Sequence, residues 1–167
     1  GMGYQSDYRL DRTKPRKHER IEGDESLESI ASCIQAFFPK LAGDAHVLMF
    51  CHWRNEPEVR ELLEASGLLI RGSLIWVKNN TGMGDPSTTF APKHERIIHA
   101  VKGSPKLYSR LPDVLECDRV PTDRHPTEKP AELLQRLIEA TTVEGELVVD
   151  PFAGVASTLV AAIACKR

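Results

Sequence analysis

Two clusters in the last third of this 167-residue chain combine residue types and spacing that suit ligand chemistry. The first is Asp150-Pro-Phe-Ala-Gly154, which Ser157 and Thr158 follow at the start of an apolar helical segment. The aspartate could accept hydrogen bonds from a cationic amine or a hydroxyl group. Gly154 lets the backbone turn sharply and approach a ligand closely, because glycine has no Cβ atom. We expect Ser157 and Thr158 to cap the helix, beside free backbone N–H groups.

The second cluster is His125-Pro-Thr-Glu-Lys-Pro130, which precedes another helical segment. Its two prolines restrict the backbone, and the positive end of the following helix would point back over the sheet edge. Taken alone, the two clusters also fit an unoccupied strand-to-helix turn and a proline-framed helix start without a ligand.

Hydrophobic periodicity predicts the elements that must position both clusters. Helices are expected at about 26–41, from Pro57 to Gly67, from Pro130 to Gly145, and after the Gly154 turn. Strands are expected at 45–50 (buried), 68–78, 95–101, near 113–117, and at 146–150. Helices and strands alternate, with connections too long for hairpins, which predicts an α/β domain with a mainly parallel sheet. Such a sheet binds ligands outside the carboxyl ends of its strands, where Asp150 lies.

Composition indicates one globular domain, with 41% hydrophobic and 28% charged residues. No apolar run approaches the ~20 residues of a membrane span. The cysteines are far apart and form no C-x-x-C pair, which argues against zinc and favours reduced, mostly buried thiols in a cytoplasmic protein. They are Cys33, Cys51, Cys117 and Cys165.

The net charge of −2 gives no overall signal for nucleic acid, but the charge is uneven. The segment from Tyr8 to Arg20 carries six basic residues against Asp11 and Glu19. It could contact phosphates, or it could be a solvated terminal segment without a partner.

Together, in this order and separated by one helix, the two clusters resemble motif X and motif I of the permuted (β-class) DNA amino-methyltransferases. Those enzymes methylate N6 of adenine or N4 of cytosine with S-adenosylmethionine. Upstream, Ile75-Trp-Val-Lys78 resembles the strand before the family's recognition region, and His94-Glu95 with the strand behind it resembles the segment after that region. The resemblance implies a Rossmann-like S-adenosylmethionine-dependent methyltransferase fold, permuted and incomplete.

The resemblance also implies one methyltransferase domain over residues 1–167. Within it, 1–25 would be a basic mobile segment and 26–102 would hold the catalytic-half strands and helices. Residues 103–124 would be a short recognition-type connection, and 125–167 the cofactor-binding half, cut short.

The implied S-adenosylmethionine site contains Asp150, Pro151, Phe152, Ala153, Gly154, Ser157, Thr158, His125, Thr127, Lys129 and Pro130. The implied contacts to double-stranded DNA are Arg9, Arg12, Lys14, Arg16, Lys17, Lys93 and His94. No metal is implied. A bacterial or phage protein is expected, as a homodimer or with a partner chain that completes the fold. His94 and Glu95 are neighbours on a strand, so we expect them to face opposite ways and to have separate roles.

Three departures from the family predict that this polypeptide alone is not catalytic. The family's Asp-, Ser- or Asn-Pro-Pro-Tyr tetrad holds the exocyclic amine and stacks on the flipped base, yet the chain contains no Pro-Pro pair. The acidic residue expected ~20 residues after the glycine turn would lie beyond Arg167. Ala156 stands where the family usually has a second glycine. Gly1–Ser6 is similar to the segment directly behind the tetrad in several members, so truncation is the expected cause.

Two other interpretations remain open. One is a non-catalytic DNA-binding or regulatory remnant of such an enzyme, which the missing tetrad would explain. The other is a Rossmann-type domain for a different small ligand, which would leave His125–Pro130 unexplained.

Overall fold

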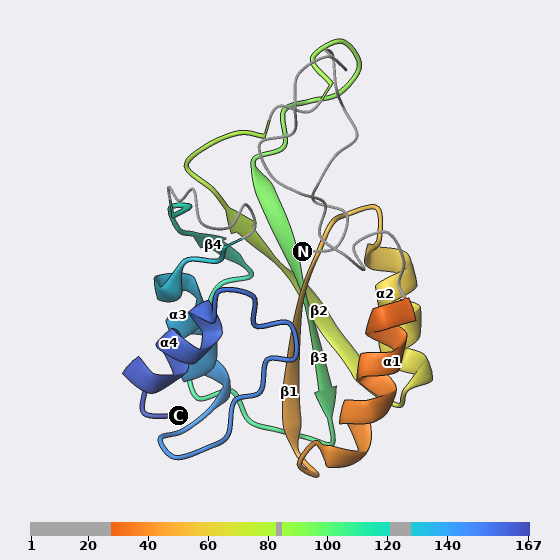
Figure 1. Cartoon of the computed structure of the whole chain (residues 1–167), viewed down its shortest axis with the longest axis vertical. Coiled ribbons are helices and arrows are strands. Elements are labelled where there is room, and N and C mark those ends of the chain that lie inside the picture. The colour runs from red at the N-terminus through yellow and green to blue at the C-terminus, as the bar shows by residue number, and fades with distance from the viewer. Residues whose placement is uncertain (1–27, 83–84, 121–127) are drawn as a thin grey trace.

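The computed structural model describes residues 28–82, 85–120 and 128–167, which form one sheet with helices on both of its faces (Figure 1). The strands are β1 (Ala45–Cys51), β2 (Leu69–Val77), β3 (His94–Lys102) and β4 (Val114–Glu116). The helices are α1 (Glu28–Phe37), α2 (Glu56–Ala65), α3 (Ala131–Thr141) and α4 (Ser157–Ala164), with a 3-10 turn at Phe38–Lys40 after α1. The predicted helices and the first four predicted strands are therefore present.

The four strands lie in the order β1-β3-β2-β4. β3 runs antiparallel to both β1 and β2, whereas β2 and β4 are parallel. The prediction of a mainly parallel sheet is therefore wrong for the pairings, although β1, β2 and β4 share one direction. The reason lies in the connection 78–93, whose described residues contain no helix. A parallel return requires a crossover, usually helical, so the chain returns antiparallel.

Two hydrophobic clusters sandwich the sheet. On one face α1 and α2 pack on β1 and β3, through buried residues that include Ile30, Ile34, Val59, Leu63, Cys51, Ile98 and Ala100. On the other face α3 packs on β2, β3 and β4, through Trp76, Ile97, Leu115, Leu133 and Leu137. A third cluster joins α3 to α4. Both faces of the sheet are covered, as expected for an α/β domain.

The ends of the helices follow from local sequence. Pro57 lies in the first turn of α2 and Pro130 is the N-cap residue of α3, both positions that tolerate a missing N–H. After α2 the chain turns at Gly67, whose φ of +92° is a conformation that glycine adopts without strain.

Two strand predictions are wrong in part. Residues 146–150 follow the hydrophobic pattern of a strand but form none, because no neighbouring strand among the described residues supplies a hydrogen-bond ladder. The predicted buried strand at 45–50 is β1, yet these six residues are only half-buried, since β1 is an edge strand. In both segments the hydrophobic pattern suits a strand, but among the described residues no further strand lies beside it.

The cysteines carry no disulfide, and Cys51, Cys117 and Cys165 are buried, as expected for reduced core thiols. In the part of the chain that the structure describes, no helix has the length and apolar character to cross a membrane.

Candidate functional site

Asp150 fastens the turn that leads into α4. Its Oδ1 accepts a hydrogen bond from the Phe152 N–H at 2.9 Å, and its Oδ2 accepts one from the Thr158 hydroxyl at 2.6 Å. The carboxylate thus connects the end of 146–150 to the first turn of the helix. Residues 151–155 are exposed between these two anchor points.

The backbone of the turn is left-handed at two places. Gly154 has a φ of +52°, and Ala156, the N-cap residue of α4, has a φ of +65°. The left-handed conformation explains why a glycine would suit position 156, because an alanine there is strained.

The predicted capping of α4 by Ser157 and Thr158 is wrong. The N-cap residue is Ala156, which has no side-chain capping bond, and the Thr158 hydroxyl is used by Asp150. The first N–H groups of any helix lack a carbonyl one turn back, and they carry the positive end of the helix dipole. The turn therefore presents a carboxylate, a helix N-terminus and the half-exposed ring of Phe152.

A second group of charges lies where β1 and β2 end. Glu95, near the start of β3, is buried and forms ion pairs with Lys78 at 2.9 Å and with Lys129 at 3.1 Å. The Lys129 ammonium also lies 5.4 Å from the centre of the Phe50 ring, at cation–π distance. Lys129 lies two residues before the start of α3, so this cluster anchors the beginning of that helix to the sheet.

The opposite charges in this cluster stabilise one another's ionised forms. Burial by itself would raise the pKa of Glu95, but the ammonium groups of Lys129 and Lys78 outweigh it and hold that pKa below its usual value. Burial lowers the pKa of Lys129, and the Glu95 carboxylate only partly restores it. Glu95 is therefore a carboxylate at neutral pH.

His52 follows directly after β1, at the same end of the sheet strands as Glu95. Burial lowers its pKa and neighbouring Arg54 adds to that effect, while the Glu95 carboxylate acts in the opposite direction. This arrangement matches the general location of ligand sites in such sheets, outside the carboxyl ends of strands.

Sequence reasoning did not include His52, Lys78 or Glu95 among the site residues. Glu95 gave one signal, since a carboxylate inside an apolar strand requires a buried partner. The structure confirms that its neighbour faces the other way: Glu95 is buried and His94 is exposed.

The sequence-predicted site residues have different surroundings. Lys93 and His94 are exposed at the start of β3, Pro130 is buried, and the Lys129 ammonium is held by Glu95. The predicted site residues in segments 9–17 and 125–127 lie outside the described part of the chain. They are Arg9, Arg12, Lys14, Arg16, Lys17, His125 and Thr127. The cofactor and DNA roles of all these residues stay predictions.

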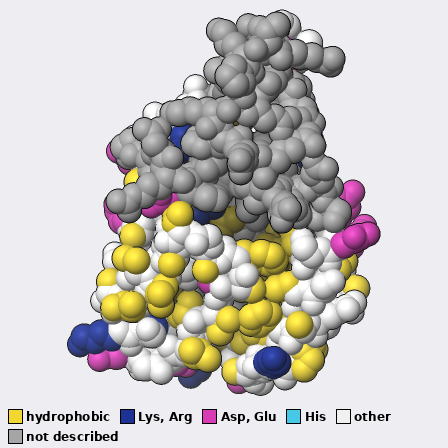
Figure 2. All heavy atoms as spheres, in the orientation of Figure 1, with side chains coloured by type: hydrophobic (Ala, Val, Ile, Leu, Met, Phe, Trp, Pro, Cys, Tyr) yellow, Lys and Arg dark blue, Asp and Glu magenta, His cyan; other side chains and the backbone are white. Residues whose placement is uncertain are grey.

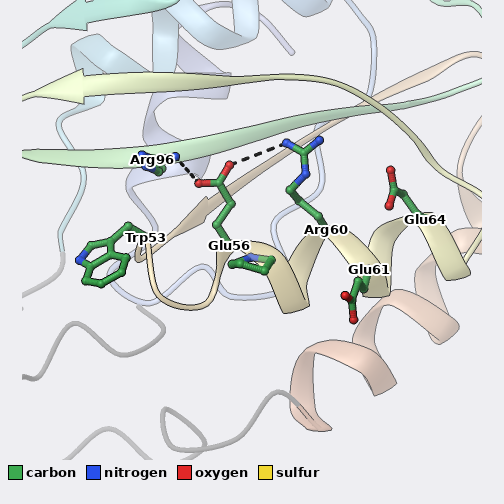
Figure 3. A pocket seen from close by; sticks show the side chains of 7 residues that line it. Trp53, Glu56, Arg60, Glu61, Glu64 and Arg96 are labelled. Atoms are coloured by element: carbon green, nitrogen blue, oxygen red, sulfur yellow. Dashed lines mark hydrogen bonds and ion pairs between the residues drawn. The ribbon is translucent and has the colours of Figure 1, made fainter.

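An open groove of about 500 Å³ lies along α2 (Figure 3). Glu56 is buried in the groove and forms ion pairs with Arg96 at 2.5 Å and with Arg60 at 3.8 Å. The negative charge of Glu56 is therefore balanced by these two arginines. None of the predicted cofactor residues lines it; the lining residues are Trp53, Glu56, Pro57, Arg60, Glu61, Glu64 and Arg96. The groove therefore does not coincide with the predicted cofactor site.

Comparisons with known proteins identify the family and the fold of the chain. A family model described as DNA methylase matches residues 110–167. The putative methylase YubD of Escherichia coli is 32% identical over 155 residues, which span 92% of this chain and 67% of that protein. The type II methyltransferase M2.DpnII of Streptococcus pneumoniae is 32% identical over 119 residues, but these span only 44% of its length.

Two solved structures share the fold. The M1.HpyAVI–SAM complex aligns over 86% of this chain and 75% of its own, with a TM-score of 0.70 and 22% identity. The PvuII cytosine-N4-specific DNA methyltransferase aligns over 97% of this chain and 70% of its own, with a TM-score of 0.71 and 17% identity. The architecture is thus a Rossmann-like methyltransferase fold, and the chain belongs to the N6/N4 DNA methyltransferase family.

Proposed function

We propose that this domain binds S-adenosylmethionine at the Asp150–Thr158 turn and serves methyl transfer to an exocyclic amine of DNA, N6 of adenine or N4 of cytosine. The observation that carries the proposal is the Asp150 carboxylate, fixed by two hydrogen bonds at the entrance to α4. The SAM complex of M1.HpyAVI, which has the same fold, supports the choice of cofactor.

The residues of the turn fit such a cofactor. Each Asp150 oxygen accepts one hydrogen bond from the protein, and a carboxylate has about four acceptor positions. Acceptor positions therefore remain for a ligand's ammonium or hydroxyl groups. A Cβ atom at Gly154 would lie 3.9 Å from the nearest heavy atom, the Phe152 carbonyl oxygen, so the turn is open on this side. When bound, the cofactor supplies an electrophilic methyl group, and the turn holds and orients it.

Duplex DNA is the proposed substrate. It would approach the end of the sheet at which β3 begins, where Lys93 and His94 are exposed. Lys78 and Lys129 add positive charge at this edge, partly neutralised by Glu95. The basic residues of segment 9–17 would add phosphate contacts.

Isothermal titration calorimetry with S-adenosylmethionine tests the cofactor site. We expect Asp150→Asn to weaken binding at least tenfold, because the neutral amide loses the attraction for the ligand's ammonium group and changes the bonds that hold the turn. Asp113→Asn, on an exposed carboxylate outside the turn, is the matched control and should leave the affinity unchanged. Absence of S-adenosylmethionine binding by the full-length protein would contradict the proposal.

A second candidate function is DNA binding without catalysis, which the lack of a Pro-Pro pair favours. In this case a gel shift with duplex DNA would occur without the cofactor and weaken steeply with salt. No shift at low salt would exclude this second function.

A further inference from the structure

The carboxylate of Glu95 joins two segments that lie far apart in the sequence. Its Oε1 pairs with the ammonium of Lys78, directly after β2, and its Oε2 pairs with the ammonium of Lys129, two residues before α3. The Lys129 ammonium also lies 5.4 Å from the centre of the Phe50 ring and 6.0 Å from that of Trp76, so it is placed over two aromatic rings of the sheet. One carboxylate thus ties the approach to α3 to the end of the sheet.

The burial of these three charges is unusual for the molecule. Figure 2 shows that, on this face, most charged side chains of the described part lie around its rim. The side chains of Glu95, Lys78 and Lys129, by contrast, are only 9%, 19% and 15% exposed. Replacing a complete buried ion cluster by apolar residues is often neutral for stability, because desolvation offsets the attraction between the charges. The distinctive property of the cluster is therefore its geometry: each oxygen of Glu95 fixes one lysine.

The placement of Lys129 bears on the Asp150–Thr158 turn through two packed helices. Pro130, the next residue along the chain, is the N-cap residue of α3. α3 lies beside α4 (Figure 1), and the two helices share the buried residues Leu134, Ile138, Ala161, Ala162 and Cys165. α4 begins at the turn, where the Thr158 hydroxyl donates to Asp150. Packed helices move as rigid elements, so a displacement at the beginning of α3 would reach the turn.

The two lysines that share the carboxylate belong to different parts of the fold. Lys78 continues the β2–β3 hairpin, because its N–H donates to the Lys93 carbonyl at 2.9 Å. Lys129 belongs to the helices that carry the turn. Glu95 is buried and both of its oxygens are engaged in ion pairs, so any effect of Glu95 on a ligand must act through a neighbouring residue.

We propose that Glu95 is a positioning residue for the binding of S-adenosylmethionine. Its carboxylate fixes the Lys129 ammonium, and thereby holds the start of α3, and through α4 the Asp150–Thr158 turn, in the arrangement that binds the cofactor. Lys78 shares the carboxylate but has no part in this effect. The proposal rests on the cofactor site proposed above and adds to it a residue that touches no ligand.

Isothermal titration calorimetry with S-adenosylmethionine on variants of the chain is the first test. We expect Glu95→Gln and Lys129→Met each to weaken binding at least about fivefold, the lower end of usual coupling effects. Lys129→Arg keeps a cation within reach of Glu95 and should restore the affinity of the parent chain. Lys78→Met is the matched control, because it removes the other ammonium from the same carboxylate and should leave the affinity unchanged. Equal losses in Lys78→Met and Lys129→Met would overturn the proposal, since any damage to the cluster would then suffice.

A double-mutant cycle separates positioning from general damage. If Glu95 acts through Lys129, then Glu95→Gln should not weaken cofactor binding further in a chain that already carries Lys129→Met, whereas independent effects would multiply. Multiplied losses would therefore contradict the proposal. If Glu95→Gln does not fold, Glu95→Asp takes its place in the cycle, because it keeps the charge but shortens the side chain by a methylene group. The comparison of Lys129→Met, Lys129→Arg and Lys78→Met is decisive without either variant of Glu95.

Amide NMR spectra of the cofactor-free chain distinguish a failure of this proposal from a failure of the proposed function. Lys129→Met should shift the amide signals of the first turn of α3 and of the Asp150–Thr158 turn, and Lys78→Met should leave both sets in place. Unshifted signals of the Asp150–Thr158 turn in Lys129→Met would refute the positioning role. If the expected shifts occur but the parent chain binds no S-adenosylmethionine, the proposed function is contradicted, while the link between the Glu95 cluster and the turn stands.

Discussion

At the residue scale, Glu95 is the side chain on which the charge balance of the sheet edge depends. It is buried and pairs with Lys78 and Lys129. Its pKa is held below the usual value by these two ammonium groups against the effect of burial. Its contribution to stability is therefore present above the unfolded-state pKa of about 4.3 and is lost as the pH falls through the lower folded-state pKa.

We expect Glu95→Gln to lower the free energy of unfolding by about 3–5 kcal/mol at pH 7, because it removes the buried carboxylate that pairs with the ammonium groups of Lys78 and Lys129. Urea denaturation measures this change. Glu58→Gln on the exposed side of α2 should change it by less than about 0.5 kcal/mol. Similar losses in the two variants would show that Glu95 is not an anchor.

The left-handed residues of the turn lead to a second prediction. Gly154→Ala should lower stability by about 1–2 kcal/mol, because its φ of +52° disfavours a residue with a Cβ atom. Ala156→Gly should not destabilise, since release from a φ of +65° offsets the extra chain entropy of unfolded glycine. Thermal unfolding compares the two; a larger loss for Ala156→Gly than for Gly154→Ala would contradict the assigned backbone.

At the element scale, a histidine pair connects β1 to β3. His46 Nε2 donates to the Lys106 carbonyl at 3.0 Å, so its Nδ1 can accept from His99 Nε2, also at 3.0 Å. Burial lowers the pKa of His99, and the neighbouring His46 and Arg71 lower it further. The folded state therefore favours neutral His99, which contributes stability above the unfolded-state pKa of about 6.5.

It follows that the free energy of unfolding should fall as the pH drops from about 6.5 through the folded-state pKa of His99. His99→Gln should reduce this slope, because the amide does not titrate. Denaturant titrations between about pH 7.5 and about pH 5 measure the slopes. A His99→Gln slope equal to that of the parent would refute this role.

At the scale of the whole molecule, the sequence lacks a Pro-Pro pair, and no strand of the described residues pairs with the outer side of β1. We therefore expect no transfer of labelled methyl from S-adenosylmethionine to duplex DNA by the 167 residues alone. Adding a polypeptide that supplies a Pro-Pro-Tyr segment should enable transfer. Heat-denatured chain with the same addition is the control. Methylation by the chain alone would show that another group replaces the tetrad.

Local patterns in the sequence were sufficient to predict the family, the helices and the strands β1 to β4, because periodicity and proline and glycine positions depend on near neighbours. They also placed Asp150 at the entrance to a helix. They could not predict the antiparallel course of β3, the Glu95–Lys129 ion pair or the engagement of Thr158 by Asp150. Each of these depends on residues that only folding brings together.

Residues 146–150 and β1 show most clearly which features the sequence determined and which the tertiary structure decided. The sequence alone determined that both are apolar and suited to strands. The tertiary structure decided that 146–150 forms no strand and that β1 lies at the edge of the sheet formed by the described residues. The physical reason is that a strand is not stable by propensity alone. It requires backbone partners from elsewhere in the sheet, and the identity of those partners is not encoded in the strand itself.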